Sequence, residues 1–270
     1  MTRGAMAKRP PAYRGVESET AWAALRQSTV ARIGLARTGA SLATAPLLEF
    51  RLAHAQARDA VHEALDEPRL RADLGALGLP VMALASAAAD RRQYLMRPDL
   101  GRCLAADAGA ALAPHAGAHE LAIVIADGLS ARAVQAHVAP LLAEALPALR
   151  ADGWRIAPLI VVHQGRVAVG DAVTVALGTQ AVATLIGERP GLSAPDSLGA
   201  YLTWQPRPRT SDADRNCISN IRPAGVGYGD AAFKLVYLLR TMRARRLSGV
   251  QLKDESDRLL IGGDAAPGKP

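Results

Sequence analysis

Residues that could carry chemistry gather in three glycine-containing segments, each of which follows a short apolar run. The segments are Asp127–Ser130, His163–Gly170 and Gly187–Gly191. Glycine allows backbone to approach a ligand closely, so each segment could line a binding site. Asp127 could act as a nucleophile, although Asp and Ser before a helix more often cap it. Glu188 could contact a ligand or form an ion pair with the adjacent Arg189.

A fourth polar segment, Asp214–Asn220, contains Cys217 and is too irregular for a core strand. A free cysteine is usually a small buried hydrophobe, but polar neighbours also suit a binding site. The other cysteine, Cys103, is too distant in sequence for a disulfide framework or a thiolate zinc site. The histidines are dispersed, so the sequence predicts no metal site.

Three familiar motifs are absent from the sequence. No G-x-G-x-x-G follows the first apolar run, and there is neither a Walker A loop nor a G-x-S-x-G turn. Their absence argues against an NAD-type dehydrogenase, a P-loop NTPase and an α/β-hydrolase. Residue types and spacing alone therefore indicate a ligand-binding domain but no reaction.

The elements that must position these segments alternate between strand and helix. Apolar runs at 121–126, 156–162 and 182–186 predict buried strands, and helical patterns follow the first two, over 134–149 and 171–178. This alternation predicts an α/β domain with a Rossmann-like or flavodoxin-like doubly wound parallel sheet. In such sheets ligands bind outside the carboxyl ends of the strands, where the three glycine-containing segments begin.

The rest of the chain divides into regions of different character. We expect a disordered basic tail over 1–15, a helical region over 16–115, the Rossmann-like domain over 116–255 and a C-terminal tail over 256–270. The helical region has no strand signal, and helices are predicted at 19–28, 47–65, 81–95 and 99–112. A further strand is expected at 200–204, and a last helix at 230–246 that Gly249 can terminate.

Composition excludes several classes of protein. Half of the residues are hydrophobic and 21% are charged, which is typical of a folded globular chain rather than a disordered one. The net charge of +7 suggests nucleic-acid binding, but the arginines are scattered among acids without interleaved aromatics, so we expect no nucleic-acid partner. No apolar run is long enough to span a membrane and no secretion signal is present, so a cytoplasmic location is expected.

Six ordered segments of the sequence resemble a single family throughout. The segments are ARIGLARTG at 31–39, LAHAQARDAVH at 52–62, IVIADGLSA at 123–131, LIGERPGL at 185–192, DADRNCISNIRP at 212–223 and LSGV at 247–250. Together they resemble the small subunit of adenosylcobalamin-dependent ethanolamine ammonia-lyase.

The resemblance implies half of an enzyme. In this family a large subunit with a (β/α)₈ barrel holds the substrate, and the small subunit helps to hold adenosylcobalamin at the interface. The cofactor supplies the radical chemistry that converts ethanolamine to acetaldehyde and ammonia. Catalytic residues are accordingly not expected on this chain, and the assembly implied is a hetero-oligomer, a trimer of heterotetramers.

Three cofactor contacts carry over to this chain by resemblance: Val167, Glu188 and Cys217. Glu188 would accept hydrogen bonds from corrin amides, whereas Val167 and Cys217 would offer small surfaces to the ring edge or nucleotide tail. The resemblance leaves Arg189 to neutralise Glu188 or to face the nucleotide phosphate.

Two departures and two alternatives accompany the resemblance. Cys103 stands where the family pattern leads us to expect a second arginine, and the Arg/Pro/Ala-rich start does not resemble the segment that directs some members to a bacterial microcompartment. The cytoplasm is therefore the expected location, with the microcompartment as the alternative.

The alternative functions are a stand-alone corrinoid or nucleotide carrier and a non-catalytic scaffold subunit.

Overall fold

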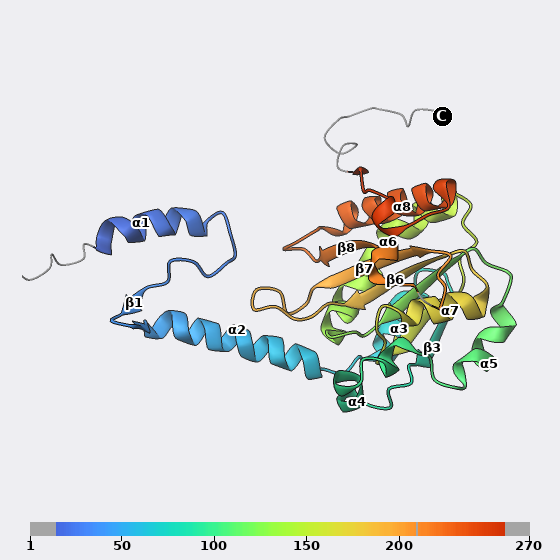
Figure 1. The fold of residues 1–270 in the computed structure, drawn as a ribbon, viewed down its shortest axis with the longest axis horizontal. Helices are drawn as coiled ribbons and strands as arrows, with labels where there is room; N and C mark the ends of the chain where they lie inside the picture. The colour runs from blue at the N-terminus through green and yellow to red at the C-terminus, as the bar shows by residue number, and fades with distance from the viewer. Residues whose placement is uncertain (1–14, 209, 257–270) are drawn as a thin grey trace, which may run out of the picture. The chain divides into compact units, whose positions relative to one another are not determined.

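The computed structural model describes residues 15–208 and 210–256 (Figure 1). The chain divides into two compact units, with the boundary between Ala55 and Gln56. The predicted tails over 1–15 and 256–270 lie outside the described residues, apart from Gly15 and Ser256.

The first unit is built from two helices and a short hairpin. Helix α1 (Gly15–Arg26) precedes strands β1 (Arg37–Thr38) and β2 (Ser41–Leu42), and α2 (Thr44–His62) begins in this unit. The two strands pair in antiparallel fashion around Gly39, whose φ of +63° favours glycine. The helices predicted at 19–28 and 47–65 are confirmed with shifted ends, and the hairpin is an addition.

The second unit contains a six-stranded sheet with the order β3-β5-β4-β6-β7-β8. Its strands are β3 (Val81–Ala85), β4 (Leu121–Ala126), β5 (Leu159–His163), β6 (Ala181–Gly187), β7 (Leu198–Trp204) and β8 (Asn216–Ile221). The first four strands in this order pair in parallel, whereas β7 and β8 pair in antiparallel fashion. The predicted α/β class is confirmed, but the prediction of a parallel sheet is wrong, because the sheet is mixed.

Connection length explains the antiparallel edge. A parallel pair needs a crossover of a dozen or more residues, usually a helix. The segments 188–197 and 205–215, which lead into β7 and β8, contain no α-helix, and the described part of the second segment has only one 3₁₀ turn. Each of these segments therefore turns the chain back, so that the strand that follows runs antiparallel to the strand before it.

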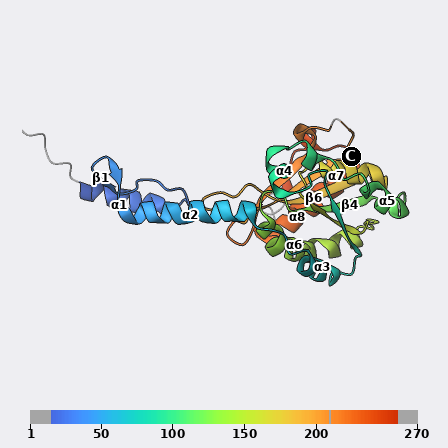
Figure 2. The same ribbon diagram turned by 90° about the horizontal axis from the view of Figure 1, so that it is seen from below.

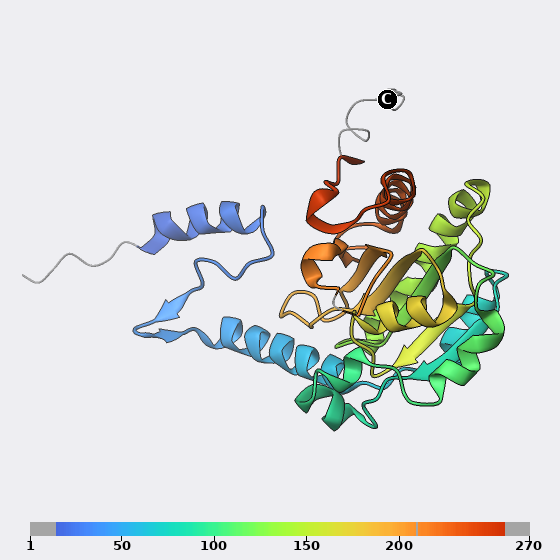
Figure 3. The same cartoon turned by 45° about the vertical axis from the view of Figure 1, so that its right-hand side comes forward.

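Helices cover both faces of the sheet (Figures 2 and 3). Helices α3 (Glu67–Gly75), α6 (Ala131–Ala151) and α8 (Tyr228–Arg245) pack on one face, and α5 (Ala108–Leu112) and α7 (Val169–Leu177) pack on the other. Side chains of β4 alternate between these two cores, with Leu121, Ile123 and Ile125 in one and Ala122 and Val124 in the other. A continuous apolar run is what a strand buried on both faces requires.

Two further predictions about secondary structure are wrong. Val81–Ala85 was expected to be helical, but it is the edge strand β3, because pairing with β5 overrides its weak local preference. The segment that contains Cys217 was judged too irregular for a core strand and was expected to lie in a loop-rich stretch; it forms the edge strand β8, with only Ile218 and Ile221 of this strand buried, under α8. The helix predicted over 81–95 is reduced to α4 (Arg91–Met96), and that over 99–112 to a 3₁₀ turn and α5.

Some helix ends follow the common capping rules. Ser130 caps α6 by accepting a hydrogen bond from the Ala133 N–H, and Gly178 ends α7 in the left-handed conformation. Helix α8 ends at Arg246, which is itself left-handed, and not at Gly249 as predicted. None of the described helices combines the length and apolar character needed to cross a membrane.

Candidate functional site

The loops after β4 and β5 are joined by a buried carboxylate, that of Asp127. Its two oxygens accept hydrogen bonds from the backbone N–H groups of Gln164 (3.0 Å) and Gly165 (3.2 Å). Burial raises the pKa of Asp127, and these N–H donors together with the positive charge of Arg91 oppose the rise. Because Ser130 is the cap of α6, Asp127 is neither a helix cap nor an exposed nucleophile; it fixes the rim of the sheet.

The glycines of these loops serve backbone-to-backbone packing. The Leu129 N–H donates to the carbonyl of Gly187 at 2.9 Å, which links the loop after β4 to the end of β6. A Cβ on Gly187 would collide with the Ser130 carbonyl, and one on Gly128 would collide with the Gly187 carbonyl. These two glycines therefore allow neighbouring loops, and not a ligand, to approach the backbone closely.

A crevice of about 410 Å³ opens at the carboxyl ends of the parallel strands. Its lining combines apolar, aromatic and charged side chains: Tyr94, Leu129, Arg166, Val167, Ile186, Gly187, Glu188, Arg189, Tyr201 and Ser219. The structure thus brings together two of the three predicted cofactor contacts, Val167 before α7 and Glu188 after β6.

Three donors hold the Glu188 carboxylate. Its Oε1 accepts from the Ser219 hydroxyl (2.7 Å), and its Oε2 accepts from the Asn220 N–H (3.2 Å) and from the Ser197 hydroxyl. A Cβ on Gly199 would lie 2.8 Å from Oε1, so β7 needs glycine there to make room for the carboxylate.

Arg189, the predicted ion-pair partner of Glu188, lies apart from this carboxylate network. It is exposed, and none of the described residues forms an ion pair with it. The prediction of a local ion pair with Glu188 is therefore wrong for the part of the chain that the structure describes. Its side chain lines the crevice.

Cys217 lies beside the crevice and not in its lining. It is exposed on β8 directly opposite Tyr201, and on the same face as Ser219, and both of those neighbours line the crevice. Desolvation raises the pKa of the Cys217 thiol, and the charge of Glu188 adds to the rise, while a hydrogen bond from Tyr201 opposes it. A protonated thiol is a weak nucleophile, so Cys217 offers a small neutral surface.

Sequence reasoning missed the aromatic floor of the crevice. Tyr94 is buried, and the guanidinium groups of Arg91 and Arg166 lie 4.7 and 4.4 Å from its ring centroid. Arg166 also donates to the Tyr94 carbonyl (2.9 Å), and Arg91 to the Gly128 carbonyl (2.7 Å). No local sequence pattern predicts this cluster, because its members come from α4 and from the loop after β5.

The described residues contain no group of three or more His, Cys, Asp or Glu side chains that could hold a metal ion. His163 in the second glycine-containing segment donates a hydrogen bond from Nε2–H to the Glu67 carboxylate (2.8 Å) and thereby lowers the pKa of Glu67. This contact ties α3 to the end of β5, which is a structural role.

Fold and crevice together define an α/β protein whose mixed sheet has a crevice at the carboxyl ends of its parallel strands. A family model described as "Ethanolamine ammonia-lyase light chain (EutC)" matches residues 19–253. The chain therefore belongs to the ethanolamine ammonia-lyase light chain, or small subunit, family.

Individual relatives agree with the family model. The chain is 57% identical over 251 residues to the ethanolamine ammonia-lyase small subunit of Xanthomonas campestris pv. campestris. The aligned region covers 91% of this chain and 92% of the relative. Identity is 54% to the small subunit of Ralstonia nicotianae, covering 90% and 92%, and 52% to that of Azotobacter vinelandii, covering 97% of each.

Proposed function

We propose that this chain, as a subunit of an ethanolamine ammonia-lyase, holds one side of adenosylcobalamin against the large subunit. The observation that carries the proposal is the Glu188 carboxylate, fixed by three donors at the edge of the crevice. When bound, adenosylcobalamin supplies the radical chemistry that deaminates ethanolamine to acetaldehyde and ammonia.

The residues present suit such a ligand. A carboxylate offers about four acceptor positions, and Ser197, Ser219 and Asn220 occupy three of those on Glu188. The remaining one can accept an N–H from a corrin amide. Val167 and the neutral Cys217 offer small surfaces nearby, and Arg166 and Arg189 carry positive charge that a nucleotide phosphate would neutralise.

The size of the crevice favours a site shared between subunits. Complete pockets for small ligands bury most of the ligand surface in about 300–1,000 Å³. Adenosylcobalamin is larger than those ligands, and a crevice of about 410 Å³ contacts only part of it. A second wall must come from elsewhere, which supports a place at the interface with the large subunit.

The first unit is our candidate for the main contact with that partner. Exposed apolar side chains concentrate in it: Trp22, Leu25, Val30, Leu42, Leu48, Phe50 and Leu52. Exposed apolar surface of this kind marks protein interaction sites. The (β/α)₈ barrel of the partner and the trimer of heterotetramers stay predictions from the resemblance. The Rossmann-like or flavodoxin-like character of the sheet and the choice between cytoplasm and microcompartment also stay predictions.

A cofactor titration of the complex tests the proposal. The chain is co-expressed with a large subunit, acetaldehyde release from ethanolamine is assayed, and the dissociation constant for adenosylcobalamin is measured by absorbance. Glu188→Gln keeps an acceptor but removes the charge, so we expect cofactor binding to weaken by about tenfold, the lower value for a hydrogen bond to a charged group. Glu144→Gln, an exposed site on α6, is the matched control.

The alternatives give different results. Unchanged cofactor affinity in a folded Glu188→Gln complex would favour a scaffold subunit. Tight binding of adenosylcobalamin by this chain without the large subunit would favour a stand-alone carrier.

A further inference from the structure

A second pocket lies at the opposite end of the sheet from the crevice. It encloses about 360 Å³ where β7 ends, and Trp204 at this end pairs with Ala181, the first residue of β6. The crevice lies at the other end of β6, beside Gly187. The two sites are therefore separated by the length of the strand.

Two arginines without side-chain partners line this pocket. Arg207 follows β7 and Arg246 ends α8, and both are exposed and form no ion pair or side-chain hydrogen bond in the described structure. The only carboxylate in the lining, Asp214, already accepts from the N–H and the hydroxyl of Ser211 at 2.8 Å each. The pocket consequently carries an excess of positive charge.

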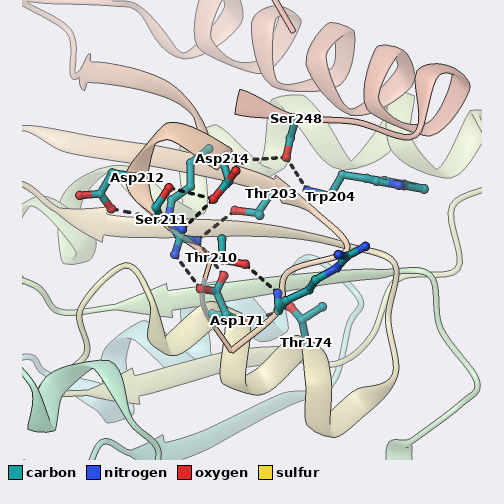
Figure 4. A network of polar contacts seen from close by, with 12 residues as sticks. Asp171, Thr174, Thr203, Trp204, Thr210, Ser211, Asp212, Asp214 and Ser248 are labelled. Atoms are coloured by element: carbon teal, nitrogen blue, oxygen red, sulfur yellow. Dashed lines mark hydrogen bonds and ion pairs between the residues drawn. The ribbon is translucent and has the colours of Figure 1, made fainter. Parts of the chain in front are cut away.

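The walls of the pocket are fixed by their own hydrogen bonds. The Ser248 hydroxyl donates to the Asp214 carbonyl (2.6 Å) and accepts from the Trp204 N–H (3.0 Å), and the Thr210 hydroxyl accepts from the Arg207 N–H (2.7 Å). These contacts join Ser248 to the segment 204–214, which is distant from it in sequence (Figure 4). A pocket held in this way is preorganised for a ligand.

Trp204 adds a polar group that lacks a partner. Its side chain is 8% exposed, and its indole Nε1 is buried without a hydrogen bond. Nine side-chain atoms of the described residues are buried without a partner in this way, so the indole nitrogen alone does not identify a ligand. Trp204 matters here because it lines the pocket and can report on its occupation.

Backbone strain is concentrated at the same place. Four described residues other than glycine have positive φ: Gln164, Gln205, Asn220 and Arg246. Gln205 (φ 44°) and Arg246 (φ 54°) line this pocket, and Asn220 donates to Glu188 at the crevice. Strained backbone of this kind clusters at functional sites.

We propose that this pocket binds the oxyanion of a small molecule, a phosphate or a carboxylate, between Arg207 and Arg246. Both guanidinium groups form charge-assisted hydrogen bonds with the ligand oxygens. The site does not depend on the proposed cofactor crevice, because it lies at the other end of the sheet.

Fluorine NMR of the full chain labelled with 5-fluorotryptophan tests the proposal. The chain has three tryptophans, and the Trp204 signal is assigned with Trp204→Phe. Inorganic phosphate and succinate are titrated separately at constant ionic strength. We expect the Trp204 signal to move saturably, with a Kd on the order of 1 mM for one or both anions; a response to one anion alone identifies the ligand group.

Paired variants separate local binding from net charge. Arg207→Ala with Arg246→Ala should weaken binding by about tenfold or more, whereas Arg92→Ala with Arg245→Ala, which removes two exposed arginines outside the pocket, should leave it unchanged. The proposal is overturned if neither anion moves the Trp204 signal, if the three tryptophan signals move together without saturation, or if both double variants respond alike.

Discussion

A buried ion pair fixes the strand that carries Cys217. The Arg215 guanidinium donates to both carboxylate oxygens of Asp171 (2.7 and 2.6 Å) and to the Thr203 hydroxyl (3.1 Å). The side chains of Arg215 and Asp171 are only 2% and 12% exposed. The pair therefore joins α7 to the start of β8 in a region where water cannot compensate a lost partner.

Removal of one charge from this pair should be costly. We expect Asp171→Ala to lower the free energy of unfolding by about 3–5 kcal/mol, because it takes from a buried guanidinium the carboxylate that accepts two of its hydrogen bonds. Asp212 is the matched control, since it lies 3.7 Å from the same arginine but is 92% exposed. Asp212→Ala should cost at most about 1 kcal/mol. Urea unfolding measures both, and equal losses would contradict the assignment.

At the scale of elements, the seating of α7 on β6 determines where Val167 points. Gly170 in the first turn of α7 faces Thr184 of β6, and a Cβ there would overlap the Thr184 hydroxyl oxygen. We expect Gly170→Ala to lower the free energy of unfolding by about 1–3 kcal/mol, because the helix must shift away from the sheet.

A second substitution checks that packing is the cause. Thr184→Ala in the Gly170→Ala chain should recover part of the lost stability, since it removes the overlapping atom. Gly109→Ala in α5, where a Cβ meets open space, should be neutral or stabilising by up to about 1 kcal/mol. Thermal or urea unfolding distinguishes these outcomes; a loss at Gly109 as large as that at Gly170 would point to a general effect of alanine.

For the whole molecule, the exposed apolar side chains of the first unit predict how the subunits assemble. Leu48 and Leu52 are 58% and 61% exposed, and their spacing places them on one face of α2. We expect Leu48→Glu with Leu52→Glu to weaken association with the large subunit by at least tenfold, because burial of one leucine contributes about 1.5–3 kcal/mol.

The control for this prediction keeps the charge change and alters its position. Val175→Glu with Val250→Glu replaces two exposed apolar residues of the second unit. Sedimentation of the co-expressed subunits should show normal assembly for this control. Equal weakening by both double variants would show that added charge, and not the face of α2, opposes assembly.

The α/β class and the three central strands could be predicted from the sequence without the fold. Runs such as Leu121–Ala126 are apolar at every position, and only a strand covered on both faces accommodates such a run. The end of α7 at Gly178 was equally readable, since it depends on local conformation. Six dispersed segments also pointed to the family, which the comparisons confirm.

Tertiary structure alone decided the edges of the sheet and the surroundings of the candidate residues. Strands β3 and β8 form because partners distant in sequence pair with them, and such pairing leaves no local periodicity. The donors on Glu188 come from β8 and from the segment before β7, and Tyr94 reaches the crevice from α4. The orphan indole of Trp204 arises in the same way, because hydrogen bonding and burial depend on neighbours that only the folded chain brings together.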